Sequence, residues 1–190
     1  TALALRTPLS DLQRGYLDAI QRSADLLLQL LNDILDFSRI EADRLELDRE
    51  VFRLRDLLDQ IADLMAAPVS QKPIELTFEL DPKVPDKIYA DPLRLRQVLI
   101  NLVQNAIKYT DEGEIAVRVS VRDEQGDQPR LVLEVEDTGI GIPPEKQATV
   151  FESFAQGRAR WDQRAGGAGL GLAIAKRLVA IMGGEITLTS

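Results

Sequence analysis

The sequence contains neither cysteine nor histidine among its 190 residues. Without cysteine the chain has no disulfide, no thiolate nucleophile and no cysteine-type zinc site. Without histidine it offers no imidazole as a general base, a metal ligand or a phosphoryl acceptor. Any chemistry that needs these groups must therefore take them from another polypeptide segment.

Long apolar runs and an excess of basic charge are also lacking. No stretch of about 18 apolar residues occurs, and no signal peptide is recognisable, so the sequence predicts no membrane-spanning helix. The chain has 23 basic and 31 acidic residues, a net charge of −8. A nucleic-acid or anionic-membrane binder needs a basic face, so we expect neither partner. A local basic pocket for phosphate groups remains compatible with this balance.

Apolar residues make up 45% of the chain, enough for one large domain, or a domain with an appendage. Ser10 and Asp11 predict the start of a helix that runs to about residue 42. Its apolar residues follow a heptad seam at Ile20, Ala24, Leu27, Leu31 and Ile34. Further leucines widen this apolar face. We favour an element of a helical bundle or dimer over a helix packed on its own domain.

The rest of the sequence mixes strands and helices without strict alternation. We predict strands at 45–47, 73–80, 113–121, 130–137 and from 185, and helices at 54–67 (ending before Pro68), 91–110, near 145–154 and at 169–184. This order predicts an α+β fold, a two-layer α/β sandwich with a mixed sheet and helices on one face, preceded by the long bundle-type helix.

Two segments place polar groups where a ligand is expected. In "NLVQNAIKYT", Asn101, Asn105 and Lys108 lie on one face of a helix. An amide oxygen suits Mg²⁺ and an ammonium suits phosphate, although a solvated surface gives the same pattern. In "EDTGIGIP", Asp137 ends a strand before Gly139 and Gly141. The carboxylate could accept a hydrogen bond from an exocyclic amine, or the segment could be a plain turn.

Two later segments are rich in glycine and arginine. In "GGAGLGLAIAKRL", glycines precede a helix whose first N–H groups could bind an anion. The spacing fits neither a Walker A loop nor a dinucleotide fingerprint, and a flexible linker is the alternative. Just upstream, "AQGRARWDQRAGG" carries Arg158, Arg160 and Arg164. It would suit a mobile lid over phosphates, or a solvated loop.

The order of these four segments resembles the ATP-binding catalytic domain of sensor histidine kinases, within the wider GHKL ATPase superfamily. "DPLRLRQVLINLVQNAIKYT" is similar to the N box, "EDTGIGIP" to the first glycine box, "FESF" to the F box and "GGAGLGLAIAKRLVAIMGGEI" to the second glycine box. "LLNDILDFSRIEADRLEL" resembles the second helix of the dimerisation and phosphotransfer hairpin. The style is closest to hybrid sensor kinases.

The resemblance implies a role for each matching residue. Asn105 would ligate Mg²⁺ and Asn101 would support it, while Lys108 would meet phosphate and Tyr109 would pack on adenine. Asp137 would recognise the adenine amino group. Residues Gly139, Gly141 and Ile142 would shape the adenine pocket, and Phe151, Phe154, Arg158, Gly167, Gly169, Leu170 and Gly171 would belong to the lid and its hinges.

Three departures from the family pattern concern the lid, the last strand and the phosphoryl acceptor. Ala168 stands where the family commonly has a hydroxyl residue. The family's last strand does not follow "EITLTS". The acceptor histidine is missing, although "LALRTPL" matches the second half of a His-Glu-Leu-Arg-Thr-Pro-Leu box, with Leu3 and Ala4 at the His and Glu positions.

This opening segment has two interpretations, an altered phosphoryl-acceptor box or the turn between two hairpin helices. An antiparallel partner for a helix of about 30 residues needs about 45 Å of helix, and none lies between such a box and the long helix. We therefore favour the turn, and expect the chain to be a truncated kinase core with its histidine elsewhere.

From the resemblance we expect residues 1–42 to belong to the hairpin and 45–190 to the ATP-binding domain without its last strand. The chain would bind ATP and Mg²⁺, and transfer the γ-phosphoryl group to a histidine that it does not contain. Its partners would be a His-bearing helix, a response regulator receiver domain and a second copy through residues 11–41. We expect a cytoplasmic location within a larger bacterial sensor, whose membrane anchoring stays open.

The alternative is a non-catalytic regulatory module that docks on a partner kinase. Another GHKL ATPase, such as a topoisomerase or chaperone domain, is disfavoured by the long N-terminal helix.

Overall fold

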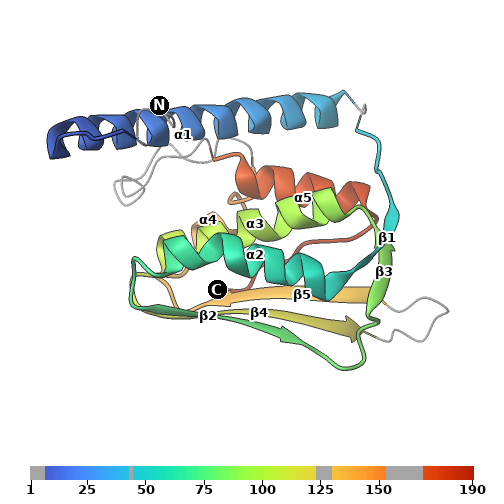
Figure 1. Ribbon diagram of the computed structural model, residues 1–190. Coiled ribbons are helices and arrows are strands. Elements are labelled where there is room, and N and C mark those ends of the chain that lie inside the picture. Colours follow the sequence, from blue (N-terminus) through green and yellow to red (C-terminus); the bar gives the residue numbers. More distant parts are fainter. Residues whose placement is uncertain (1–6, 43–44, 123–129, 153–168) are drawn as a thin grey trace.

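A computed structural model describes residues 7–42, 45–122, 130–152 and 169–190 (Figure 1). Its elements, in chain order, are α1 (Asp11–Glu41), β1 (Glu50–Arg53), α2 (Leu54–Val69), β2 (Ile74–Leu80), β3 (Lys87–Ala90), α3 (Pro92–Tyr109), β4 (Gly113–Arg122), β5 (Arg130–Asp137), α4 (Pro144–Gln147) and α5 (Gly171–Ile181). Helices cover one face of a mixed sheet, which confirms the predicted α+β sandwich.

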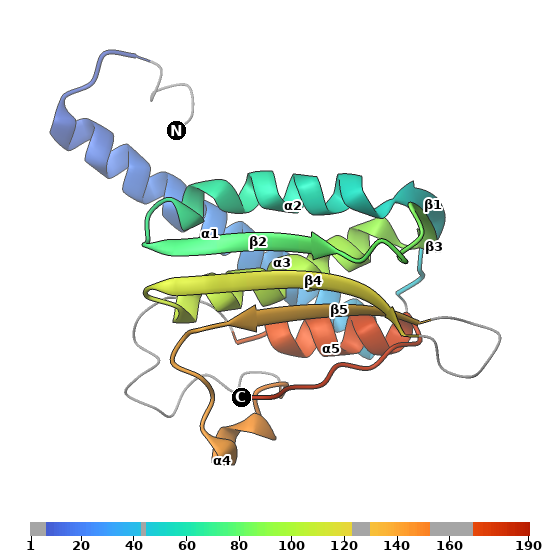
Figure 2. The ribbon, with the colours of Figure 1, turned by 90° about the horizontal axis from the view of Figure 1, so that it is seen from below.

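The main sheet has the order β2-β4-β5, with β2 parallel and β5 antiparallel to β4. Alternate residues of each strand face the helices, because side chains of a strand point to opposite faces in turn. Ile115, Val117 and Val119 of β4 are fully buried in this way. They pack with α2 and α3, and α5 lies on the same side of the sheet beside α3 (Figures 1 and 2). A separate pair, β1 with β3, stands at one end of the domain.

The opposite face of the sheet is polar. Arg118 on the central strand β4 pairs with Glu79 of β2 and with Glu136 of β5, so it joins all three strands. The hydrogen bond with Glu136 raises the pKa of Arg118. The sheet thus buries one face and exposes the other, as a two-layer fold requires.

The structure corrects several expected boundaries. Residues 45–47 do not form a strand, and the first strand begins only at Glu50. Leu45 packs against the apolar cluster that α1, α3 and α5 share. Helix α2 continues through Pro68 to Val69, since a proline keeps a helical φ and removes only one N–H group near the helix end. The helix expected near 145–154 is limited to Pro144–Gln147 in its described part. Strand β3 was not predicted.

The C-terminal residues 185–190 were also expected to begin a strand, and they are not in a ladder. Ser190, at the end of this segment, makes two hydrogen bonds to residues far away in the sequence. The Ser190 hydroxyl accepts a hydrogen bond from the Ile142 N–H at 2.7 Å, and its carbonyl accepts one from the Gln147 side chain at 3.2 Å. These contacts join the end of the segment to the loop that follows β5 and to the end of α4.

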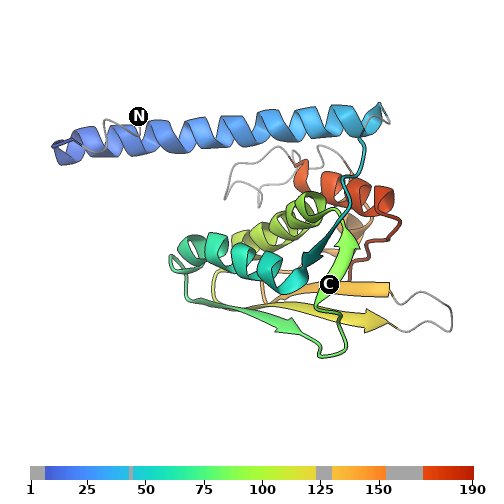
Figure 3. The same cartoon turned by 45° about the vertical axis from the view of Figure 1, so that its right-hand side comes forward.

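Helix α1 begins at the predicted cap. The Ser10 hydroxyl accepts from the Gln13 N–H, and the Gln13 side chain accepts from the Ser10 N–H, which forms a capping box. The C-terminal end of α1 packs on α5 and α3 through Ile40 and Phe37. The rest of α1 extends past the domain (Figure 3). It exposes about half or more of each of Leu12, Tyr16, Ile20, Leu27, Leu28, Leu31, Ile34 and Leu35. Within the described residues, no helix combines the length and apolarity needed to cross a bilayer.

Candidate functional site

Helix α3 carries three of the predicted site residues on its more exposed face. Asp91 caps its first turn and Pro92 occupies its first position, where a missing N–H costs nothing. Apolar side chains on the opposite face are buried in the core, among them Leu99, Val103 and Ile107. This packing fixes the rotation of α3, and Asn101, Asn105 and Lys108 remain half-buried along one side.

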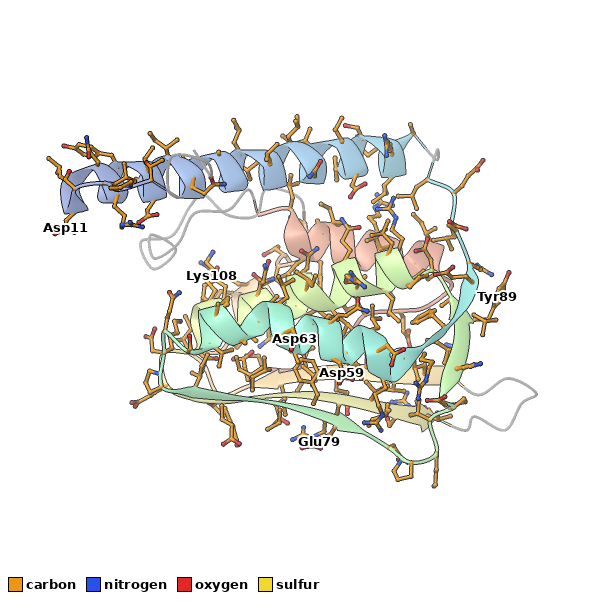
Figure 4. All side chains as sticks on the ribbon, viewed as in Figure 1. Asp11, Asp59, Asp63, Glu79, Tyr89 and Lys108 are labelled. Atoms are coloured by element: carbon orange, nitrogen blue, oxygen red, sulfur yellow. The ribbon has the colours of Figure 1, made fainter. Side chains whose placement is uncertain are left out.

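Two of these side chains face defined neighbours. The Asn101 side chain donates a hydrogen bond to the carbonyl of Gly171 at 3.1 Å, which joins α3 to the first residue of α5. The Lys108 ammonium lies 4.9 Å from the centroid of the Tyr109 ring, a distance typical of a cation–π contact. Lys108 stands at the end of α3 that lies farthest from Tyr89 (Figure 4).

Asn105 lies one turn after Asn101 and has a different environment. Its side chain is half-buried and makes no hydrogen bond to any other residue in the described parts of the chain. A half-buried amide without a partner among the residues that the structure describes has an oxygen available for a hard cation. The same described residues contain no cluster of three acidic, histidine or cysteine side chains that could hold a metal alone. An ion at Asn105 would therefore need most of its ligands from a bound molecule and from water.

The loop after β5 is fastened to the last turn of α3. The Asp137 carboxylate accepts from the Gly139 N–H at 2.9 Å, and the Ile140 N–H donates to the Tyr109 carbonyl at 3.3 Å. A Cβ atom on Gly139 would lie 2.5 Å from the Tyr109 carbonyl oxygen, so only glycine allows this approach. Gly141 has a φ of 66°, in the left-handed region that glycine favours. The predicted adenine-binding and phosphate-binding segments therefore meet at one place.

Lys72, on the connection between α2 and β2, fastens the same turn from another direction. Its ammonium donates to the carbonyl oxygens of Ile107, Lys108 and Thr110 at 2.6, 3.2 and 2.8 Å. The carboxylate of Asp111 lies 3.9 Å away. Lys72 was not predicted from the sequence, because a lysine beside a proline in a polar turn carries no pattern that indicates which backbone it contacts.

At the start of α5, the residues expected at the lid hinge have distinct roles in packing. Gly169 has a φ of 68°, and Leu170 is buried at the helix N-cap in the cluster that includes Ile40 of α1. Near them, the Lys176 ammonium lies 5.3 Å from the ring of Phe151. The predictions for Phe154, Arg158, Arg160, Arg164, Gly167 and Ala168 concern positions outside the described residues.

A second polar contact joins α1 to the domain and was also missed. The Arg94 guanidinium donates to Asp36 at 3.2 Å and to the Gln97 side chain at 2.9 Å, and Gln97 donates to Asp36 at 2.7 Å. The side chains of Arg94 and Asp36 are only 14% and 16% exposed. Heptad spacing in α1 indicates its apolar face, but a lone acidic residue in it does not reveal a partner on α3.

The comparisons agree with this arrangement of helices, loop and sheet. The model of the family "Histidine kinase-, DNA gyrase B-, and HSP90-like ATPase" matches residues 90–190, and the chain belongs to this family. The model of the "His Kinase A (phospho-acceptor) domain" matches residues 1–43. The resemblance stated from the sequence is thereby confirmed.

Several relatives are sensor kinases by name. The chain is 44% identical to "Signal transduction histidine-protein kinase BarA" of Escherichia coli over 100% of its own length and 21% of the relative. It is 41% identical to "Hybrid signal transduction protein dokA" of Dictyostelium discoideum, over 99% of this chain and 11% of that protein. The chain thus spans about a fifth or less of the curated relatives' length.

A solved structure shares both the fold and much of the sequence. "Crystal structure of ShkA full-length in complex with AMPPNP" matches with a TM-score of 0.76 and 40% identity, over 94% of this chain and 36% of that one. The Acinetobacter baumannii histidine kinase AdeS matches with a TM-score of 0.69 over 92% of this chain and 75% of that one. At 22% identity, AdeS supports the fold alone.

Proposed function

We propose that this chain is the ATP- and Mg²⁺-binding catalytic core of a two-component sensor histidine kinase. It transfers the γ-phosphoryl group of ATP to a histidine that it does not itself contain. Residues 45–190 form the ATP-binding domain, and residues 1–42 belong to the dimerisation and phosphotransfer hairpin. Because the nucleotide substrate is cytoplasmic, we place this segment in the cytoplasm.

One observation carries this proposal: the predicted nucleotide-binding segments converge on the exposed side of α3. Asn101 contacts the first residue of α5, and Tyr109 contacts the loop that holds Asp137 and Gly139. These segments are far apart in the sequence, and an ordinary solvent-exposed surface does not require them to be in contact. ShkA, a protein of the same fold, was crystallised in complex with AMPPNP, an ATP analogue.

The roles of the residues follow from their position and chemistry. Asp137 would accept a hydrogen bond from the adenine amino group, next to the backbone that Gly139, Gly141 and Ile142 leave open. Lys108 would contact phosphate, and Tyr109 would contact adenine. Asn101 and the start of α5, at Gly169, Leu170 and Gly171, would border the phosphates. Phe154, Arg158 and Gly167 complete the proposed set as parts of the lid.

Asn105 would hold Mg²⁺ together with the phosphate oxygens of the nucleotide, because its amide oxygen has no hydrogen bond to a described residue. When bound, the ion neutralises charge on the transferred phosphoryl group. The protein's own part is to orient the nucleotide on α3 and to hold Lys108 near its negative charge. Positioning and charge neutralisation are the main requirements of phosphoryl transfer.

In the proposed reaction, an imidazole nitrogen of the acceptor histidine forms a bond to the γ-phosphorus. The bond from this phosphorus to the β–γ bridging oxygen breaks, and ADP leaves with that electron pair. The acceptor histidine lies on a hairpin helix outside this sequence. A receiver domain of a response regulator would then take the phosphoryl group, and the exposed apolar side of α1 would pair with a second copy through residues 11–41.

Calorimetric titration of the chain with AMPPNP, with and without Mg²⁺, tests the binding step. We expect saturable binding that Mg²⁺ strengthens, and no binding at millimolar nucleotide would contradict the proposal. Mixing the chain with radiolabelled ATP and a separately produced hairpin that carries a histidine tests the transfer. An acid-labile label on the hairpin is expected. A chain that binds nucleotide but never labels the hairpin would favour the non-catalytic regulatory alternative, which no named relative supports.

A further inference from the structure

Lys72 lies outside all the segments that the sequence patterns single out, yet its ammonium makes three hydrogen bonds to the end of α3. It reaches the last turn of α3 from the connection between α2 and β2. Its three hydrogen bonds to backbone carbonyls are 2.6, 3.2 and 2.8 Å long. The side chain is 29% exposed, so most of its length is covered by protein.

These bonds complete the hydrogen bonding of a helix end. The last carbonyls of an α-helix have no partner within the helix and need other donors. At the end of α3, the Ala106 carbonyl accepts from the Thr110 N–H, and the Tyr109 carbonyl accepts from the Ile140 N–H. Lys72 supplies the donor for Ile107, Lys108 and the capping residue Thr110. Its positive charge also favours the negative end of the helix dipole.

The turn that Lys72 holds is the one that carries Lys108 and Tyr109 and that meets the loop of Asp137 and Gly139. The connection that carries Lys72 is itself fixed, because the Gly113 N–H donates to the Pro73 carbonyl at 3.2 Å just before β2 pairs with β4. Lys72 therefore ties the helix end to the parallel strand pair. Without it, the carbonyls of Ile107, Lys108 and Thr110 would lose this donor, whereas the backbone bond from Ile140 to Tyr109 would remain.

We propose that Lys72 is a positioning residue for nucleotide binding: its ammonium fixes the backbone of residues 107–110, and so the placement of the Lys108 and Tyr109 side chains. This inference rests on the proposed nucleotide-binding function. Lys72 does not contact the reacting atoms. It acts through the backbone, which predicts a loss of affinity for the nucleotide without a comparable loss of folding.

The test compares Lys72→Met, Lys72→Arg and the control Lys87→Met in calorimetric titrations with AMPPNP and Mg²⁺. Methionine keeps the length of the side chain but removes its donors and charge, whereas arginine keeps both. Lys87 is an exposed lysine on β3, so its replacement makes the same charge change elsewhere. We expect Lys72→Met to weaken binding about tenfold, or about 1.4 kcal/mol. Lys72→Arg should restore most of the affinity, and Lys87→Met should match the wild type.

Thermal unfolding of each variant separates positioning from a structural role, because titrations are run well below the unfolding temperature. Equal affinity of folded Lys72→Met and wild type would overturn the inference, and so would a failure of arginine to rescue. If Lys72→Met does not fold, the milder Lys72→Gln decides, with weaker binding expected and unchanged binding contradicting us. A wild type that binds no nucleotide would instead refute the proposed function.

Discussion

At the first turn of α3, the buried carboxylate of Asp91 accepts hydrogen bonds from the backbone N–H groups of Arg94 and Asp48, at 3.0 and 2.9 Å. At the last turn, the partly exposed ammonium of Lys72 donates to backbone carbonyls. Each group complements the helix dipole at its own end. The two ends differ in what they join: the first turn meets α1 and the chain before β1, and the last turn meets the proposed nucleotide site.

The difference in burial separates stability from function along one helix. Asp91 is 3% exposed, and loss of its carboxylate would remove the acceptor of two backbone N–H groups at the edge of the core. The last turn is held by the partly exposed side chain of Lys72 and by the exposed carboxylate of Asp137, and the side chains of Lys108 and Tyr109 remain half-buried there. We expect changes at the first turn to alter the free energy of unfolding, and changes at the last turn to alter ligand affinity.

The largest effect is expected from Asn105→Ala, which removes the proposed cation ligand. We expect AMPPNP binding with Mg²⁺ to weaken about 100-fold, or ~2.7 kcal/mol, and binding without Mg²⁺ to change much less. Calorimetry in both conditions measures this. Gln104→Ala, an exposed amide on the same helix, serves as the control. Equal losses with and without Mg²⁺ would show that Asn105 does not act through the ion.

Asp91→Ala is expected to have the largest effect at the other end of α3. The change removes a helix cap and leaves the Asp48 N–H without its acceptor, so we expect a loss of about 2 kcal/mol in the free energy of unfolding. Urea unfolding measures it, and Asp91→Asn should lose less because an amide oxygen also caps a helix. A strong effect on the nucleotide affinity of folded Asp91→Ala would break the proposed separation between the two ends.

Gly139→Ala tests the contact between the loop and the last turn. The new Cβ would lie 2.5 Å from the Tyr109 carbonyl oxygen and 2.8 Å from the Asp137 carboxylate, so the loop must move away from α3. We expect about tenfold weaker AMPPNP binding, or ~1.4 kcal/mol. Fluorescence or calorimetric titration checks it. Gly15→Ala, where nothing lies within 4 Å, is the matched control and should leave binding unchanged.

Much of the fold could be predicted from the sequence because its patterns are local. Alternation in β2, β4 and β5 and the capped amphipathic pattern of α3 depend on neighbours a few residues apart. The strands expected at 45–47 and from 185 were wrong for a different reason. A strand needs a partner, and "LEL" and "EITLTS" show β propensity without showing whether an edge is available.

The candidate site likewise contains contacts that a local sequence pattern predicts and contacts that it does not. The placement of Asn101, Asn105 and Lys108 along one side of α3 could be predicted because helical spacing puts them on one face, and their role in binding stays a prediction. Lys72 and Asp36 could not, because their partners are 35–38 and 58–61 residues away. Every residue has a backbone carbonyl, so the identity of the bound residues does not indicate that a lysine contacts them. Contacts between a side chain and backbone atoms are therefore the part of a site that is hardest to predict from a single sequence.

The smallest effect is expected where α1 meets the first turn of α3. A double-mutant cycle of Asp36→Ala and Arg94→Ala should give a coupling of about 1 kcal/mol in urea unfolding, because both side chains are mostly buried and share Gln97 as a partner. The pair Arg53 and Asp86, whose side chains are 51% and 59% exposed, should couple less. Nucleotide affinity should stay within about twofold in all these variants, since additivity holds for distant sites. A coupling no larger than that of the exposed pair would mean that the apolar contact of Ile40, and not this polar contact, holds α1 on the domain.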